Sequence, residues 1–197
     1  MPSDLQVDNI KDKSATKTLA TLSSSAVTLH DDVTFPAGHV IQTVQNTYNS
    51  ANSQTLSSNQ SFQRFTIADS SMPFTGQLTN VKANSHVYIQ MALTIESANN
   101  TSAVDLGTGV GIFRESSAIF TPRVYQNYWY GMIDTGASIN ESKQFYHHMN
   151  IVFIDTSPAT GTNNYYAGGI TYNNSSLTIK SDSNFYPFVC ILQEIAQ

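Results

Sequence analysis

Hydrophobic and polar residues alternate with a period of two along much of the chain after residue 36. Residues 86–95 (HVYIQMALTI) show it most clearly, because every second position from Val87 to Ile95 is apolar and the positions between are more polar. This alternation predicts a half-buried β-strand. Less regular or shorter strands are predicted at residues 39–48, 61–67, 110–114, 118–124, 165–172 and 177–180.

Two further segments are apolar on both faces towards their ends, namely residues 145–154 (FYHHMNIVFI) and 185–195 (FYPFVCILQEI). Strands with a neighbouring layer on each side have this pattern. Eight or nine short strands, with no helical period and no internal repeat, predict an all-β antiparallel sandwich, for which a jelly roll is the leading architecture. Clusters of turn-forming residues separate the strands, at residues 97–100, 107–109, 157–161 and 173–176.

The first 35 residues differ from the rest of the chain. They contain no aromatic residue before Phe35, although they carry three Lys and five Asp. We predict an extended arm over residues 1–35, with short strands near residues 5–10, 18–22 and 27–29, and a β-sandwich over residues 36–197. Such an arm buries little on its own, so it either lies on another chain or is loosely ordered.

Composition and charge exclude several classes of protein. The 197 residues include 24 Ser, 21 Thr and 17 Asn but only 12% charged residues, which disfavours a helical bundle. A net charge of −5 argues against a nucleic-acid partner, which would require a basic surface. The longest mainly apolar run, residues 185–192, is too short to span a bilayer, and the N-terminus lacks the apolar stretch of a secretory signal, so we expect synthesis in the cytosol and no membrane insertion.

Candidate metal and cofactor sites are weak. His147 and His148 are adjacent on a predicted strand, so their side chains point to opposite faces and cannot bind one ion together. A metal site formed by one His from each of several symmetry-related subunits stays open as an alternative. Cys190 is the only cysteine. The glycines of residues 107–111 (GTGVG) lack a following helix, which favours a β-turn or bulge over a phosphate loop. We expect no metal and no cofactor.

Enzyme signatures are also weak, and we expect no catalytic residues. There is no Gly-x-Ser-x-Gly elbow, and Ser is too abundant for its presence beside His and Asp to be informative. A hydrolase stays open only if His147 or His148 lies within hydrogen-bonding reach of both a Ser and an Asp.

An aromatic stretch offers a candidate contact with a receptor or glycan. Its residues are Tyr125, Tyr128, Trp129 and Tyr130. Aromatic side chains in polar loops can stack on sugars or anchor protein contacts. The alternative, which we favour, is that they cover one end of the sandwich or a seam between subunits.

Several segments together resemble a family of small fibre or appendage proteins of tailed bacteriophages, especially phages of marine bacteria and cyanobacteria. The N-terminal elements are residues 7–10 (VDNI) and 35–44 (FPAGHVIQTV). Further similar segments are residues 86–96, 111–119 (GIFRESSAI), 150–158 (NIVFIDTSP) and 163–168 (NNYYAG), so the resemblance spans nearly the whole chain.

The resemblance implies a virion structural protein, a homotrimer with a C-terminal jelly roll similar to the tumour-necrosis-factor/C1q type and an N-terminal arm bound to a capsid or tail protein. Such a protein is made in the bacterial cytoplasm and exposed at the virion surface. On this basis the anchoring residues are expected to be Leu5, Val7, Ile10, Leu19 and Leu22. The trimer interface is expected to include His86, Tyr88, His147 and Phe188.

The resemblance does not decide the position on the particle. We favour a head fibre or capsid-decoration knob, since a tail fibre commonly has a longer shaft and this chain has neither repeats nor heptads to build one. The alternative is a tail-fibre or receptor-binding protein that contacts a host surface glycan through the aromatic stretch.

Overall fold

The computed structural model describes residues 9–11, 18–22, 27–29, 36–48, 52–57, 61–65, 74–99, 105–121, 129–132, 144–172, 175–181 and 187–197. The chain forms two compact units, Met1–Ala37 and Gly38–Gln197, and each is described by itself. The division lies two residues after the boundary that composition predicts. All regular elements in the described residues are β-strands, which confirms the all-β fold class.

The first unit contains a small antiparallel sheet with the strand order β1-β2-β3. Its strands are β1 (Asn9–Lys11), β2 (Thr18–Leu22) and β3 (Val27–Leu29). The register aligns Ile10 with Ala20 and Ala20 with Leu29, and Ala20 is buried. A unit of fewer than about 40 residues rarely buries enough apolar surface to be stable without a partner, a metal or disulfides.

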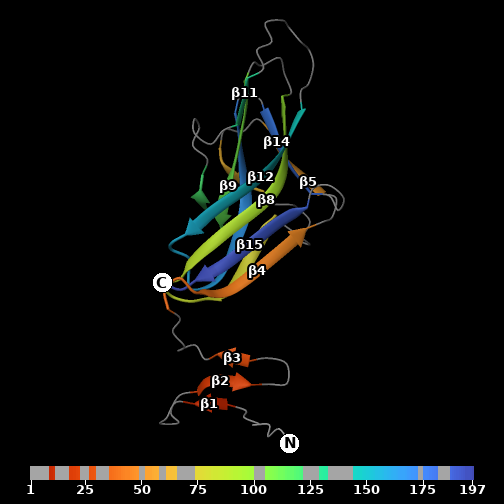
Figure 1. The fold of residues 1–197 in the computed structure, drawn as a ribbon. Helices are drawn as coiled ribbons and strands as arrows, with labels where there is room; N and C mark the ends of the chain where they lie inside the picture. The colour runs from red at the N-terminus through yellow and green to blue at the C-terminus, as the bar shows by residue number, and fades with distance from the viewer. Residues whose placement is uncertain are drawn as a thin grey trace, which may run out of the picture. The chain divides into compact units, whose positions relative to one another are not determined.

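The first sheet of the second unit has β8 at its centre (Figure 1). On one side, β8 (His86–Asn99) pairs along its length with β12 (Gln144–Asp155). On the other side it pairs first with β15 (Phe188–Ile195) and then with β14 (Ser175–Ser181). Two outer strands complete this sheet, β4 (Val40–Tyr48) beside β15 and β5 (Asn52–Ser57) beside β14.

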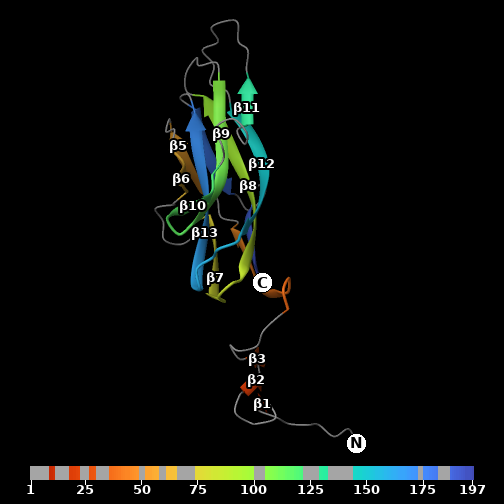
Figure 2. The same cartoon turned by 90° about the vertical axis from the view of Figure 1, so that its left-hand side faces the viewer.

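The second sheet lies against the first and faces the viewer in Figure 2. Its central strands are β9 (Asp105–Arg114) and β13 (Gly161–Tyr172), which pair with each other. The outer edge of β9 pairs with β10 (Ser117–Phe120) and β11 (Trp129–Met132). The outer edge of β13 pairs with β6 (Gln63–Arg64) and β7 (Thr75–Val81).

The strand order is that of a jelly roll. In four places, two consecutive strands together take the place of a single strand of a jelly roll. These pairs are β4 with β5, β6 with β7, β10 with β11, and β14 with β15, so the chain has eight strand positions. Positions 1, 8, 3 and 6 then form the first sheet and positions 2, 7, 4 and 5 the second. This alternation between two antiparallel sheets is the double Greek key of a jelly roll, so the predicted architecture is confirmed.

The hydrophobic core fills the space between the two sheets. Alternate residues of β8, from Val87 to Ile95, point into it and are almost fully buried, as the period-two pattern predicts. Aromatic rings form one part of the core: Phe74 contacts the rings of Tyr48, Phe65 and Phe188 at centroid distances of 6.2, 6.5 and 5.3 Å.

Two turn predictions are wrong. The glycine-rich segment of residues 107–111 is the middle of β9, because its backbone pairs with β13, with Gly111 opposite Gly168. Residues 97–99 continue β8, where β12 and β14 extend the sheet on either side. The sequence pattern also missed β5, β7 and β11, which have little apolar alternation.

No helix in the described part of the chain is long and apolar enough to cross a membrane.

Candidate interaction surface

Part of the face of the first sheet that points away from the core is uncharged across four strands. The registers of β12, β8, β15 and β4 align three rows of residues on this face. The rows are Ile154–Tyr88–Gln193–Thr43, Val152–Gln90–Ile191–Gln45 and Asn150–Ala92–Val189–Thr47. We call these twelve residues the neutral face, since none of them carries a charge.

All twelve residues of the neutral face are at least partly exposed. Val152 and Ile154 on β12 are 52% and 48% exposed. The neighbouring Ile151, whose side chain points to the core, is only 7% exposed. The prediction that residues 145–154 have a protein layer on each side is therefore wrong for a single chain. Within the described part of the chain, only the core side of β12 is covered, although both sides are apolar.

Polar side chains of the neutral face bond mainly to one another. Gln90 donates to Asn150 at 3.3 Å and Gln193 donates to Thr43 at 3.4 Å. Gln45 donates to Thr47 at 3.3 Å. These amides and hydroxyls therefore keep a hydrogen bond even without water, which lowers the free-energy cost of covering the face.

Two charged residues lie farther along the same side of this sheet, and they pair with each other. Lys180 on β14 forms an ion pair with Glu96 on β8, and the bond to Glu96 raises the pKa of Lys180. The Lys180 ammonium also lies 5.0 Å from the centre of the Tyr146 ring. Next to this group, the Thr94 hydroxyl and Nδ1 of His148 are 2.8 Å apart.

The residues predicted for a trimer interface fall on both sides of this sheet. Tyr88 belongs to the neutral face, and His86 lies two residues before it on the same side of β8. Phe188 is 1% exposed and contributes to the core, because it contacts Phe74. His147 is aligned with Ile95 on the core side of β12. Neither Phe188 nor His147 is therefore presented to a second copy on the outer face.

The two adjacent histidines point to opposite sides of β12, as the strand pattern predicts. His147 lies beside a pocket of about 330 Å³ between β8, β9 and β12. Partial burial lowers the pKa of His147, which favours its neutral form. Among the described residues, no group of three or more His, Cys, Asp or Glu side chains is arranged to hold a metal ion.

The other predicted contact residues lie partly outside the described residues. Tyr125 and Tyr128 are outside them. The backbone of Trp129 and Tyr130 begins β11, where these residues pair with Thr108 and Gly107 of β9. In the arm, Leu5 and Val7 lie outside the described residues, while Ile10 is in β1 and Leu19 and Leu22 are in β2.

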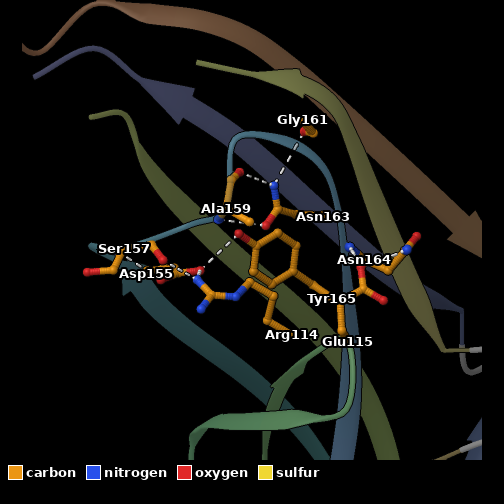
Figure 3. A network of polar contacts seen from close by, with 9 residues as sticks. All are labelled: Arg114, Glu115, Asp155, Ser157, Ala159, Gly161, Asn163, Asn164 and Tyr165. Carbon is orange, nitrogen blue, oxygen red and sulfur yellow. Dashed lines mark hydrogen bonds and ion pairs between the residues drawn. The ribbon is translucent and has the colours of Figure 1, made fainter. Parts of the chain in front are cut away.

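A polar network holds the connection between β12 and β13 against β9 (Figure 3). Arg114 donates to the buried Asp155 carboxylate at 2.6 Å and also to the carbonyl of Ser157. The Tyr165 hydroxyl donates to the same carboxylate at 3.0 Å, and the Ser157 backbone N–H donates to it at 3.1 Å. Burial, together with the negative charge of Asp155, raises the pKa of Tyr165, so Tyr165 stays a donor.

Two asparagines extend this network along β13. Asn163, which is buried, bonds to the backbone N–H and carbonyl of Ala159 and so closes the turn before β13 (Figure 3). Glu115 at the β9–β10 turn has a φ of 52°, and its carboxylate accepts bonds from both the backbone and the side chain of Asn164 at 2.8 Å. The side chains of this network bond to other residues of the same unit, so we assign the network to the stability of this end of the sandwich.

Sequence reasoning found neither the neutral face nor the polar network. The neutral face depends on the register of four strands, and Arg114 and Asp155 are separated by 41 residues. The only signal for the neutral face was the apolar character of both sides of residues 145–154.

Comparisons with known proteins add little. No protein-family model matches the chain, and no curated protein sequence matches it. Among solved structures, a chain in the structure of infectious bursal disease virus, Gx strain, matches with a TM-score of 0.30 and 13% identity over 100% of this chain and 45% of that one. A chain of T=1 particles derived from infectious bursal virus matches with a TM-score of 0.29 and 14% identity over 100% and 44%.

The chain thus spans less than half the length of both matched chains. Scores at this level carry no functional information, so the proposals below rest on the chain's own residues.

Proposed function

We propose that the chain is a non-enzymatic structural protein of a tailed-phage virion. In this proposal it is a homotrimeric head fibre or capsid-decoration knob, exposed at the particle surface. The N-terminal arm binds a capsid or tail protein, and the jelly roll projects from the particle. The resemblance to phage appendage proteins, with their jelly roll of the tumour-necrosis-factor/C1q type, is the source of this proposal.

The observation that carries the proposal is the division of the chain between Ala37 and Gly38 into two unlike units. The first contains a sheet of three short strands in a unit of fewer than about 40 residues, a size at which a partner is usually needed for stability. The second is a jelly roll with a full core of its own. A small unit that needs a partner, joined to a larger unit that folds around its own core, suits an anchor and a displayed knob.

Charge substitutions in the arm test the proposed anchor. By register, positions 10 and 22 lie on the same side of the arm sheet as Ala20, whereas positions 21 and 28 lie on the other side. We expect Ile10→Asp combined with Leu22→Asp to remove the chain from purified particles, because an aspartate in an apolar contact is desolvated without a partner. Quantitative immunoblotting of purified particles measures this loss.

The matched control is Thr21→Asp combined with Thr28→Asp, which adds the same charge to the other side of the arm sheet. We expect this control to be incorporated as well as the wild type. Equal incorporation of both variants would contradict anchoring through the predicted apolar residues.

A further inference from the structure

We propose that the outer side of the second sheet holds a binding site for one pyranose ring of a neutral sugar. Its central residues are Phe62, Arg64, Glu115 and Tyr166, and we call them the outer-sheet site. The inference goes beyond the proposed structural role, which stands or falls independently of it. The outer-sheet site is also separate from the aromatic stretch of residues 125–130.

The residues of the outer-sheet site come from neighbouring strands and share one side of the second sheet (Figure 2). On β13, Tyr166 lies between two fully buried core residues, so its side chain points away from the core, and that of position 168 does the same. The registers align Phe113 of β9 with Tyr166, and Arg64 of β6 with Gly168. The fold therefore gathers aromatic and charged side chains on the outer side.

Two aromatic rings lie in layers on this side of the sheet. A Cβ at Gly168 would lie 2.5 Å from the Phe113 ring, so the absence of a side chain there lets this ring lie against β13. The Phe62 ring stacks on Phe113 with a centroid distance of 4.6 Å and an angle of 11° between the planes. Phe113 is buried, whereas Phe62 is partly exposed. The stack thus brings a flat apolar ring to the surface, where the C–H face of a sugar can pack on it.

Both donors and acceptors of hydrogen bonds lie beside these rings. Nη1 of Arg64 donates to the Glu115 carbonyl at 2.9 Å, and the guanidinium lies 4.4 Å from the centre of the Tyr166 ring. A guanidinium has five N–H groups, so Arg64 can also donate to a ligand. Glu115 is exposed, and the two bonds from Asn164 go to the same carboxylate oxygen, Oε1. A carboxylate accepts about four bonds, so Glu115 can also accept from a ligand.

The combination of groups favours a neutral sugar. Two adjacent hydroxyls of a pyranose can accept from the Arg64 guanidinium and donate to the Glu115 carboxylate, so one ligand uses both groups. The charges of Arg64 and Glu115 cancel, which gives a phosphate or another ion no net attraction. A protein partner would require about 800 Å² of contact surface, much more than one ring offers.

The polar groups are also held in place before a ligand binds. Gln77 on β7 donates to the side chain of Asn164 at 2.7 Å, and Asn164 in turn donates to Glu115 at 2.8 Å. The Arg64 guanidinium is fixed by its bond to the Glu115 carbonyl and by the Tyr166 ring. Side chains that are already ordered lose little conformational freedom on binding, which is important for a small ligand with few contacts.

Saturation-transfer NMR on the full chain tests the outer-sheet site. The probes are the methyl pyranosides of glucose, galactose and mannose, and N-acetylglucosamine. We expect transfer to at least one of them, with a dissociation constant of about 1 mM, the order expected for a ligand of this size. Phe62→Ala and Arg64→Met should each weaken binding by about tenfold, because they remove the stacking ring and the charged donor.

The matched control is Tyr146→Ala, on the first sheet. Tyr146 is 49% exposed, and the Lys180 ammonium lies 5.0 Å from the centre of its ring. This control therefore also removes an exposed aromatic ring beside a cation, and we expect it to bind the probe as the wild type does. Loss of binding in the control would overturn the assignment to the outer-sheet site.

Glu115→Gln provides a further test if Phe62→Ala does not fold. The glutamine oxygen can still accept from Asn164, so the local structure is retained, but the charged acceptor for a sugar hydroxyl is lost. We expect this variant to bind the probe about fivefold more weakly than the wild type.

Two other results would overturn the proposal. One is a wild type that shows no transfer to any of the four probes. The other is unchanged binding in both Arg64→Met and Glu115→Gln. Neither result bears on the proposed virion role, which is tested by incorporation of the arm variants into particles.

Discussion

We expect Phe74→Ala to lower the free energy of unfolding by about 3–5 kcal/mol, the cost typical of removing a buried aromatic ring. Phe74 is fully buried, and its ring contacts those of Phe65, Phe188 and Tyr48. These neighbours come from both sheets, since Phe188 is on β15 while the backbone N–H of Phe65 donates to the carbonyl of Ala167 on β13. The cavity left by the ring therefore lies where the two sheets meet.

Urea unfolding at a fixed protein concentration measures this effect, because the stability of an oligomer depends on concentration. The control is Phe62→Ala, which removes a ring that is only partly buried and stacks on Phe113 at 4.6 Å. We expect the control to cost about 1–2 kcal/mol, for one aromatic pair and the partial burial of its ring. Equal losses for the two variants would contradict the position of Phe74 at the centre of the core.

The second large effect is expected for Arg114→Met. This change removes the cation that pairs with Asp155 and leaves a carboxylate that is 6% exposed. Loss of one partner of a buried ion pair costs about 3–5 kcal/mol, and we expect about 2–3 kcal/mol here because the Arg114 side chain is partly exposed. Tyr165 and the Ser157 N–H still bond to Asp155, which also limits the loss.

A double-mutant cycle separates the charge from the packing of Arg114. Asp155→Asn in the Arg114→Met background should recover part of the lost stability, since it removes the uncompensated charge. The control is Arg64→Met, at an arginine whose guanidinium donates to the carbonyl of Glu115 at 2.9 Å and lies 4.4 Å from the centre of the Tyr166 ring. We expect that control to cost less than about 1 kcal/mol. An Arg114→Met variant as stable as the control would mean that Asp155 requires no cation.

The parts of the fold that the sequence predicted are those with a strong local pattern. The five alternate apolar residues of β8 form the central strand of the first sheet, and the change of composition near Phe35 marks the division between the two units. β5 (NSQTLS) and β7 (TGQLTNV) were missed because they consist largely of neutral polar residues. Their strand conformation depends on pairing with β14 and β13, which no local pattern reveals.

Glycines misled the prediction at β9 for a related reason. The segment GTGVG resembles a turn when only local propensity is considered. In the fold, β9 lies between β13 and the outer strands β10 and β11, so the surrounding sheet overrides the preference of glycine for turns. A Cβ at Gly168, opposite Gly111, would lie 2.5 Å from the Phe113 ring, so close packing also requires a glycine on the partner strand.

The candidate surface was out of reach of the sequence for a different reason. Its residues come from four strands, and only the registers show that the uncharged positions of β12, β8, β15 and β4 fall into common rows. The sequence showed only that both sides of β12 are apolar. The structure shows that no described part of the same chain covers the outer side of this strand.

The most direct test of the proposed function is the location of the chain on intact particles. Electron microscopy of purified virions, labelled with an antibody against the jelly roll, makes this measurement. A structural protein displayed on a head should give label on the outside of the capsids, and the Ile10→Asp/Leu22→Asp variant should lose that label. Unlabelled particles, with the wild-type chain found only in the host lysate, would contradict a virion protein.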